Sequence, residues 1–323
     1  MKRILLIFLI VSSAASFAQS IHEPLYNNDI YDFLDNQASK GNIGLFDDVR
    51  PYTRILISEK LLELKGKRVA LTNSENKQLD FFLSEYAFEK MFIEKNSTKV
   101  SEFFRFGVTD RFKVYKYYDK NFTFDIDPVF GIGYDFSRGN YSQFGGIKFK
   151  GRISDFIGFY FDYRDFTETG DSLDFDKAFT PETGIQTLQR TETSMNYSEA
   201  RGGLTFGWSW GNFSVAKDFI NIGSSYQSSV IMSSKAPSFP FMRLDISPVD
   251  WFQYNFVHAW LDSQMIDSTT IRHIGPEAKY RGSDSYSRRF KYYVSHTFSF
   301  KPFENWWLTF GESIIYGDRL EFI

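Results

Sequence analysis

Histidine and cysteine side chains are usual starting points for chemistry, and this 323-residue chain has only four histidines. Its histidines are His22, His258, His273 and His296. They show neither an HExxH pattern nor another metal-ligand spacing. A lipase-type strand would place serine and histidine two residues apart on one face, whereas Ser295 and His296 are neighbours on opposite faces. The chain has no cysteine. We therefore predict no catalytic residues, metal or cofactor, although a triad of distant residues has no sequence signature.

Charged residues recur at every second position within apolar stretches, which places them on one face of their strands. These residues are Asp125, Asp127, Lys148, Lys150, Asp162, Arg164, Arg243, Asp245, Arg289 and Lys291. Both signs are present, so such a wall can hydrogen-bond sugar hydroxyls or a carboxylated polysaccharide. In the alternative interpretation, these residues pair with each other and with a plug that fills a closed barrel.

Aromatic and basic residues also lie in three long connections rich in Ser, Thr, Gly and Asp. Tyrosine can stack on sugar rings, and arginine can bind acidic sugars. The candidates for polysaccharide binding are Tyr197, Tyr226, Arg272, Tyr280, Arg281, Tyr286 and Arg288. We assign Trp208 and Trp210 instead to anchoring at a lipid interface.

These side chains must be positioned by strands, because the sequence period becomes two after about residue 100. In residues 157–164, Ile157, Phe159, Phe161 and Tyr163 alternate with smaller or polar residues. Each such run is close to the roughly ten residues that a tilted strand needs to cross a membrane. Aromatic residues make up 19% of the chain, yet the mean hydropathy is only −0.32. This combination favours an antiparallel, up-and-down transmembrane β-barrel over residues 99–323.

Connection lengths support the same fold. The links near Gly211–Asn212 and Ser247–Asp250 are short, and those near Thr167–Tyr197, Gly223–Ser238 and Asp262–Arg288 are long. Short periplasmic turns alternate with long extracellular loops in outer-membrane barrels, whereas a propeller would repeat a four-strand unit, which we do not find. We count about nine strands from residue 121 onward. Because bacterial barrels need an even number, we expect the sequence to be a C-terminally truncated fragment.

The N-terminal residues predict export and a helical domain. Lys2 and Arg3 precede an apolar run and a small-residue cleavage site, so residues 1–18 form a signal peptide. Residues 19–98 predict three short amphipathic helices that bury their faces in a periplasmic bundle. Thr53 can cap the second helix, and Thr72 with Glu75 forms a capping box for the third.

Glu312 does not fit the alternation. It has the same strand parity as Leu308, Phe310 and Ile314, which directs its carboxylate toward lipid. Either a bulge shifts the register at this point, or Glu312 lies at the membrane interface.

Several short motifs resemble the Wzi-type capsule assembly family. The N-terminal motifs are Asp47–Thr53 and Leu79–Tyr86, and those of the strand region are Asp125–Val129, Ile231–Pro240 and Gly311–Arg319. The resemblance implies an outer-membrane barrel of about eighteen strands with a three-helix bundle at its periplasmic mouth. It also implies a lectin-like role in holding or assembling surface polysaccharide, without catalysis. Some relatives are linked to surface gliding.

We therefore predict an outer-membrane protein that binds, anchors or helps assemble capsular polysaccharide. Its expected partners are outer-membrane lipid, surface polysaccharide and, during biogenesis, the outer-membrane insertion machinery. The formal net charge is −3 and no basic stripe is present, so we expect no nucleic-acid partner. The alternatives are a channel or transporter for a small polar solute, or a component of surface gliding or adhesion machinery.

Overall fold

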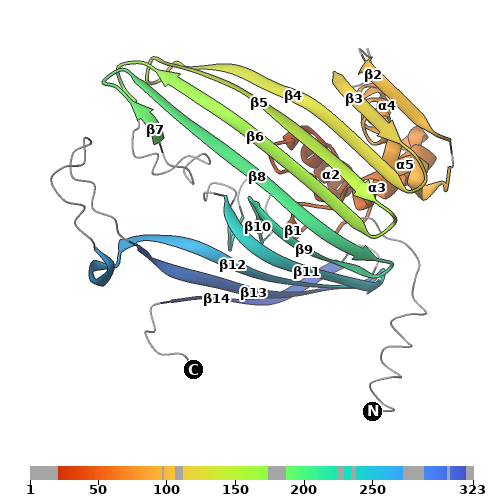
Figure 1. Cartoon of the computed structure of the whole chain (residues 1–323). Coiled ribbons are helices and arrows are strands. Elements are labelled where there is room, and N and C mark those ends of the chain that lie inside the picture. Colours follow the sequence, from red (N-terminus) through yellow and green to blue (C-terminus); the bar gives the residue numbers. More distant parts are fainter. Residues whose placement is uncertain are drawn as a thin grey trace.

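Alternating strands build most of the molecule, which we describe from a computed structural model. The structure describes residues 21–96, 98–105, 112–173, 187–223, 229–233, 238–271, 287–303 and 306–317. Its main element is a 12-stranded antiparallel sheet in the order β14-β13-β12-β11-β9-β8-β6-β5-β4-β3-β2, with β7 paired to β8 (Figure 1). The strands are β2 (Val100–Arg105), β3 (Lys113–Tyr118), β4 (Phe122–Asp135), β5 (Asn140–Ile153), β6 (Ile157–Thr169), β7 (Thr187–Arg190), β8 (Ser194–Trp208), β9 (Gly211–Asp218), β11 (Phe239–Val249), β12 (Phe252–Ile266), β13 (Arg288–Phe303) and β14 (Trp306–Gly317).

Neighbours in the sheet are almost always neighbours in sequence, so the predicted mainly β, up-and-down order is confirmed. Along the path from β4 to β14, the described residues form the nine strands predicted from residue 121 onward. The sheet curves but does not close, because no described pairing joins β2 to β14. The closed barrel therefore stays a prediction.

The two faces of the sheet differ in chemistry. On β4, Thr123, Asp125 and Asp127 are buried on the inner face, whereas Phe130 and Ile132 are each 80% exposed on the outer face. A strand directs successive side chains to opposite faces, so the period-two pattern of the sequence is sufficient to produce this separation. The outer face is apolar and the inner face is polar along most of the sheet.

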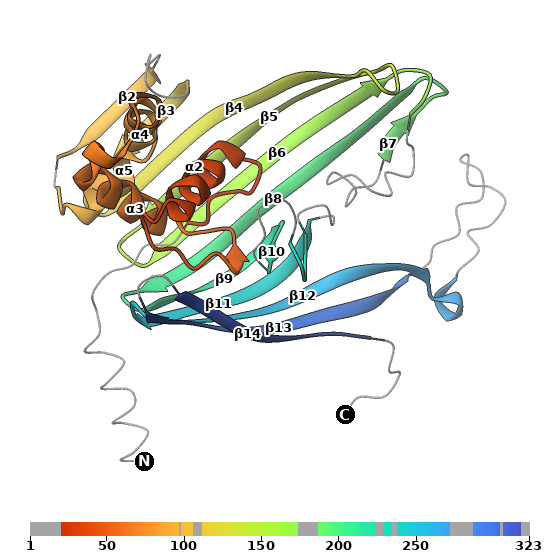
Figure 2. The ribbon, with the colours of Figure 1, turned by 180° about the vertical axis from the view of Figure 1, so that it is seen from behind.

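The helices lie on the inner, concave side of the sheet, toward the end where the strand connections are short (Figures 1 and 2). They are α2 (Asn28–Ser39), α3 (Arg54–Gly66), α4 (Asn73–Glu85) and α5 (Ala87–Ile93), with short 3₁₀ turns at Arg68–Ala70 and Ser268–Thr270. None of the described helices is both long and apolar enough to cross a membrane. Leu34, Ile57, Leu61, Leu64 and Leu79 are fully buried in the core among these helices.

The predicted helix starts are confirmed in atomic detail. The Thr53 hydroxyl accepts a hydrogen bond from the Leu56 amide, and Thr72 and Glu75 cap each other reciprocally. The predicted third helix is divided at Tyr86, which ends α4 and precedes α5. Local capping chemistry therefore fixes where the helices begin.

A small second sheet lies inside the curve of the large one. In it, β1 (Val49–Arg50) pairs with β10 (Asn221–Ile222), so the chain turns inward after β9 instead of extending the large sheet. We call the large 12-stranded sheet the wall. Around this pair, Val49, Ile220 and Ile222 pack against apolar inner-face residues of the wall. These residues are Ala216, Phe239, Phe241, Val257, Ala259 and Tyr293.

Candidate functional site

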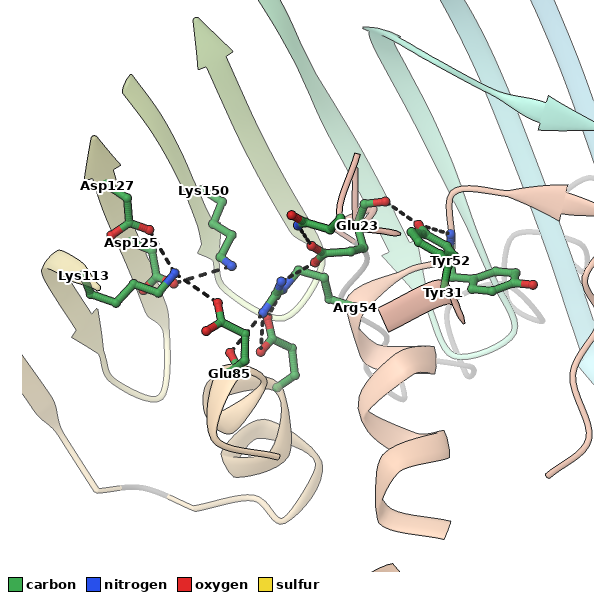
Figure 3. Close-up of polar contacts among 11 residues, drawn as sticks. Glu23, Tyr31, Tyr52, Arg54, Glu85, Lys113, Asp125, Asp127 and Lys150 are labelled. Carbon is green, nitrogen blue, oxygen red and sulfur yellow. Dashed lines mark hydrogen bonds and ion pairs between the residues drawn. The ribbon is translucent and has the colours of Figure 1, made fainter. Parts of the chain in front are cut away.

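Charged side chains from the helices and the sheet meet in a buried charge cluster (Figure 3), which we define as Glu23, Arg54, Glu85, Glu89, Lys113, Asp125, Asp127 and Lys150. On the sheet side, Lys113 Nζ lies 2.9 Å from Asp127 Oδ2 and 3.2 Å from Glu85 Oε1. Lys150 Nζ lies 3.6 Å from Asp125 Oδ2. The Lys113–Glu85 pair therefore joins strand β3 directly to helix α4.

Arg54 is the centre of the helical side of the cluster. The Thr53 cap places it as the first residue of α3, where its guanidinium binds both Glu23 and Glu89. A second Arg54 nitrogen, Nη2, lies 3.2 Å from Glu89 Oε2, and the guanidinium carbon lies 4.2 Å from the centre of the Tyr86 ring. One arginine thus neutralises two buried carboxylates.

The electrostatics of this group follow from burial and pairing. Burial alone would raise the pKa of Glu89, but the Arg54 charge overrides it and lowers that pKa to about 2. The pKa of Glu23 is also lowered, because Arg54 outweighs the effect of burial. Both carboxylates are therefore ionised at neutral pH, and each depends on Arg54 for compensation.

Tyr26 makes a second contact between the wall and residues 21–93, which we call the N-terminal segment. Its hydroxyl donates a hydrogen bond of 2.6 Å to Asp162 Oδ2. The guanidinium carbons of Arg164 and Arg201 lie 4.2 Å and 4.7 Å from the centre of its ring. Burial, followed by the Asp162 charge, raises the pKa of Tyr26, so the phenol stays protonated. The tyrosine is held between two cations through its ring and by a carboxylate through its hydroxyl.

On β11, Arg243 and Asp245 form a third contact. Arg243 Nη1 donates to the Pro51 carbonyl at 2.9 Å, and its Nε donates to Asp245 at 2.7 Å. Asp245 also accepts a hydrogen bond from Asn255 and lies 3.5 Å from His22 Nε2. Burial lowers the pKa of His22, which favours its neutral ring.

The sheet brings together most of the charged residues predicted to share its inner face. Asp125, Asp127, Asp162, Arg243 and Asp245 are buried. Lys148, Lys150, Arg164 and Arg289 are half-buried, and Lys291 is exposed. Lys291 pairs with Gly317, the last residue of β14. These residues were predicted either to bind sugars or to pair with each other and with a plug. The structure provides contacts for the second interpretation, with the N-terminal segment in the place of the plug.

The residues predicted to bind polysaccharide are largely outside the described part of the chain. Tyr226, Arg272, Tyr280, Arg281 and Tyr286 lie outside it. Arg288 begins β13, and its side chain is not described.

Tyr197 is a correction, because it lies in strand β8 and not in a loop. Its side chain is buried, its ring stacks on Phe166 with centres 4.9 Å apart, and its hydroxyl donates to Glu168. The chain re-enters the sheet earlier than the polar composition of the connection indicates, so Tyr197 has no free face for a sugar.

The sequence analysis did not identify several of the residues that hold the N-terminal segment. Glu199 and Arg201 are buried on the inner face of β8, and their parity is opposite to that of Trp208, which the sequence assigns to the lipid side. Counting the alternation back from Trp208 would have found them. Glu23, Arg54 and Glu89 have no comparable signal, because their partners are distant in sequence.

Between the N-terminal segment and the wall, the structure leaves a cavity of only about 40 Å³, lined by Tyr26, Lys148 and Asp162 among others. This volume accommodates water but not a sugar ring. Among the described residues, no three His, Asp or Glu side chains are grouped to hold a metal ion. The arrangement is suited to holding the N-terminal segment against the inner face of the sheet by paired charges.

Comparisons of this chain with family models, with curated proteins and with solved structures found no match. The Wzi-type resemblance therefore rests on the short motifs alone.

Proposed function

We propose that this protein is an outer-membrane β-barrel whose N-terminal helical segment is a fixed plug, and that it binds or organises surface polysaccharide without catalysis. The observation that carries the proposal is the separation of faces: apolar side chains are exposed outside, and ionic pairs are buried inside. Proteins that remain in water rarely expose a large continuous apolar surface.

The outer face has the dimensions of a membrane-spanning surface. On β14, exposed Trp306 and Tyr316 lie at opposite ends of a mostly apolar row that includes Leu308, Phe310 and Ile314. Ten residues of strand extend about 33 Å, and a tilt of about 45° reduces this to about 23 Å across a membrane. That height is close to the apolar band of about 25 Å, flanked by aromatic girdles, in outer-membrane barrels.

Buried pairing favours a plugged protein over an open channel. Arg54 and Tyr26 are on the N-terminal segment, and the groups that hold them are largely buried. Removing one partner of such a pair strands the other charge, so a plug of this kind does not leave readily. The channel alternative needs an open lumen. Its distinguishing property is conductance, which we expect to be absent in planar lipid bilayers.

The polysaccharide would bind at the end of the sheet away from the helices. The ends of β6, β8, β12 and β13 that lead into the long connections lie at that end, whereas the helices lie toward the short turns (Figure 1). In outer-membrane barrels the long loops are extracellular, and this polarity supports a polysaccharide site in the long connections. The candidate residues Tyr280 and Tyr286 belong to the connection between β12 and β13.

The test has two stages. The chain, expressed with its export signal, should fractionate with outer membranes and remain there after a carbonate wash. Cells with the Tyr280→Ala/Tyr286→Ala variant should then retain less capsular polysaccharide, with Tyr197→Phe as the matched control because Tyr197 is buried. Recovery in the soluble fraction would remove the membrane assignment. Unchanged retention would remove the role of these loop tyrosines.

A further inference from the structure

A row of polar side chains crosses the outer face of β12, β13 and β14. Glu312 pairs directly opposite His296, and the register is regular from Phe300 to Lys291, so no bulge turns Glu312 inward. Ser295 and Ser313, the adjacent residues on the two strands, are hydrogen-bonded to each other on the inner face. Glu312 therefore points outward from the middle of β14 and is exposed.

His296 extends this row to the next strand. Its Nδ1 lies 2.8 Å from the Tyr254 hydroxyl of β12. The neighbours on the same face are apolar: Phe298 pairs with Phe310 on one side of the row, and Val294 pairs with Ile314 on the other. A carboxylate and an imidazole thus lie side by side within an exposed apolar surface.

This position is unfavourable in contact with lipid chains. In membrane proteins, ionisable side chains at such depth generally face protein or water, and they mark functional surfaces. The apolar band on β14 runs from Trp306 to Tyr316, and Glu312 lies between them, away from both aromatic ends. If the sheet spans a membrane as proposed above, another protein surface must cover Glu312.

The arrangement of charge points to a second copy of this chain as that surface. A twofold axis along the membrane normal keeps every side chain at its own depth and exchanges left with right. An axis passing between β13 and β14 therefore brings Glu312 of one copy opposite His296 of the other, and the reverse. The acid and the base are adjacent on neighbouring strands, as a self-complementary interface of this kind requires.

We propose that the outer face of β12–β14 is a dimer interface in the membrane, in which Glu312 of each copy pairs with His296 of its partner. The partner is a second copy of this chain in the same orientation. Phe298, Phe310, Val294 and Ile314 surround the polar pair and supply the apolar contact around it. This inference rests on the proposed membrane location.

Cysteine cross-linking in intact membranes tests the interface, since the chain has no cysteine of its own. Copies with Ile314→Cys and a small tag are expressed together with copies bearing Val294→Cys and a large tag, and a mild oxidant is added. The expected product is a disulfide-linked species of both tags. The matched control pair is Leu204→Cys with Val215→Cys, which are also opposite each other and exposed on the outer face, but on β8 and β9.

The polar pair is tested in the same assay. Glu312→Leu suits a lipid-facing site and should leave the chain folded, yet we expect it to reduce the cross-linked fraction about tenfold, equivalent to about 1.4 kcal/mol. Exchanging the two residues, by Glu312→His with His296→Glu, should restore cross-linking. No restoration, or equal cross-linking at the β8–β9 control pair, would overturn the interface. Loss of the protein from the membrane fraction would instead count against the proposed function.

Discussion

The N-terminal segment contacts the sheet in two regions of different chemistry. Toward β3–β8 it is held by buried charges, among them Arg54, Glu89 and Tyr26 with its arginine and aspartate partners. Toward β9–β13 it is held by the β1–β10 pair and by apolar packing around Ile220 and Ile222, in addition to the contacts of Arg243 and Asp245 with Pro51 and His22. One segment is therefore seated by two different kinds of force.

Buried ion pairs and apolar packing respond differently to mutation and to pH. A buried ionic group contributes little net free energy compared with a well-packed apolar one, but losing one partner is severe because the other charge is stranded. Apolar packing loses free energy in proportion to the volume removed, and it responds little to pH or salt. We infer that the charged region fixes one position and orientation, and we expect the apolar region to supply much of the stability.

The largest expected effect comes from breaking the charged region at Arg54. Replacement by alanine strands Glu23 and Glu89, so we expect the free energy of unfolding to fall by about 3–5 kcal/mol. Urea titration of the protein in detergent micelles, followed by Trp fluorescence, measures this. The control is Arg68→Ala, whose partner Asp80 is exposed, and it should leave the midpoint unchanged. Equal loss in both variants would show that burial does not distinguish them.

The apolar region is broken by Ile222→Ala, which empties a fully buried position beside Val49. We expect a loss of about 2–5 kcal/mol in the free energy of unfolding, from lost contact and from the cavity left behind. In the same titration at neutral and at acid pH, this loss should stay constant, whereas that of Arg54→Ala should shrink as the stranded carboxylates become protonated. Parallel pH dependence in the two variants would contradict the contrast between the regions.

Acid provides a graded test of the charged region alone. Because the pKa of Glu89 is lowered to about 2 from its ordinary 4.5, the stability from its ion pair is complete above about pH 4.5 and is lost as pH falls toward 2. The expected loss is on the order of 3 kcal/mol. Unfolding followed across this pH range should show a steeper decline for the wild-type chain than for Glu89→Gln. A slope unaffected by that substitution would assign the acid sensitivity to other groups.

The smallest effect is expected from Tyr26→Phe. This change removes the hydrogen bond to Asp162 but keeps the ring between Arg164 and Arg201. We expect a loss of about 1–2 kcal/mol, and Tyr26→Ala should lose more because the ring contacts go as well. Protease protection of the N-terminal segment in membranes reports both variants. If Tyr26→Phe is as damaging as Tyr26→Ala, the ring contacts contribute nothing.

Much of the fold follows from local sequence patterns. Alternation placed Asp125, Asp127 and Arg243 on one face, and the hydroxyl and carboxyl of Thr72 and Glu75 marked the start of a helix. These features are predictable because each depends on residues within a few positions of one another. The same reasoning identified Glu312 as an exception, and the regular register at that point decides which way it faces.

The contacts that hold the N-terminal segment inside the sheet could not be predicted in the same way. Pairing of Val49 with Ile222 depends on main-chain groups distant in sequence, which leave no period in the residues. Arg54 could have been assigned to any solvated helix end, since only the fold brings Glu23 and Glu89 to it. Tyr197 was misplaced because polar composition indicates a loop even where a strand has already begun.

The contacts between the N-terminal segment and the wall also imply an order of folding. The Thr72–Glu75 cap joins residues three apart, whereas Arg243 reaches the Pro51 carbonyl over 192 residues and Ser299 reaches Asp48 over 251. Contacts between nearby residues form early, and those that close long loops form late. The helices can therefore fold first, before the strands of the wall assemble around them. During that interval their charged surface remains hydrated, so the same carboxylates and arginines that later lock the segment in place keep it soluble until the wall is complete.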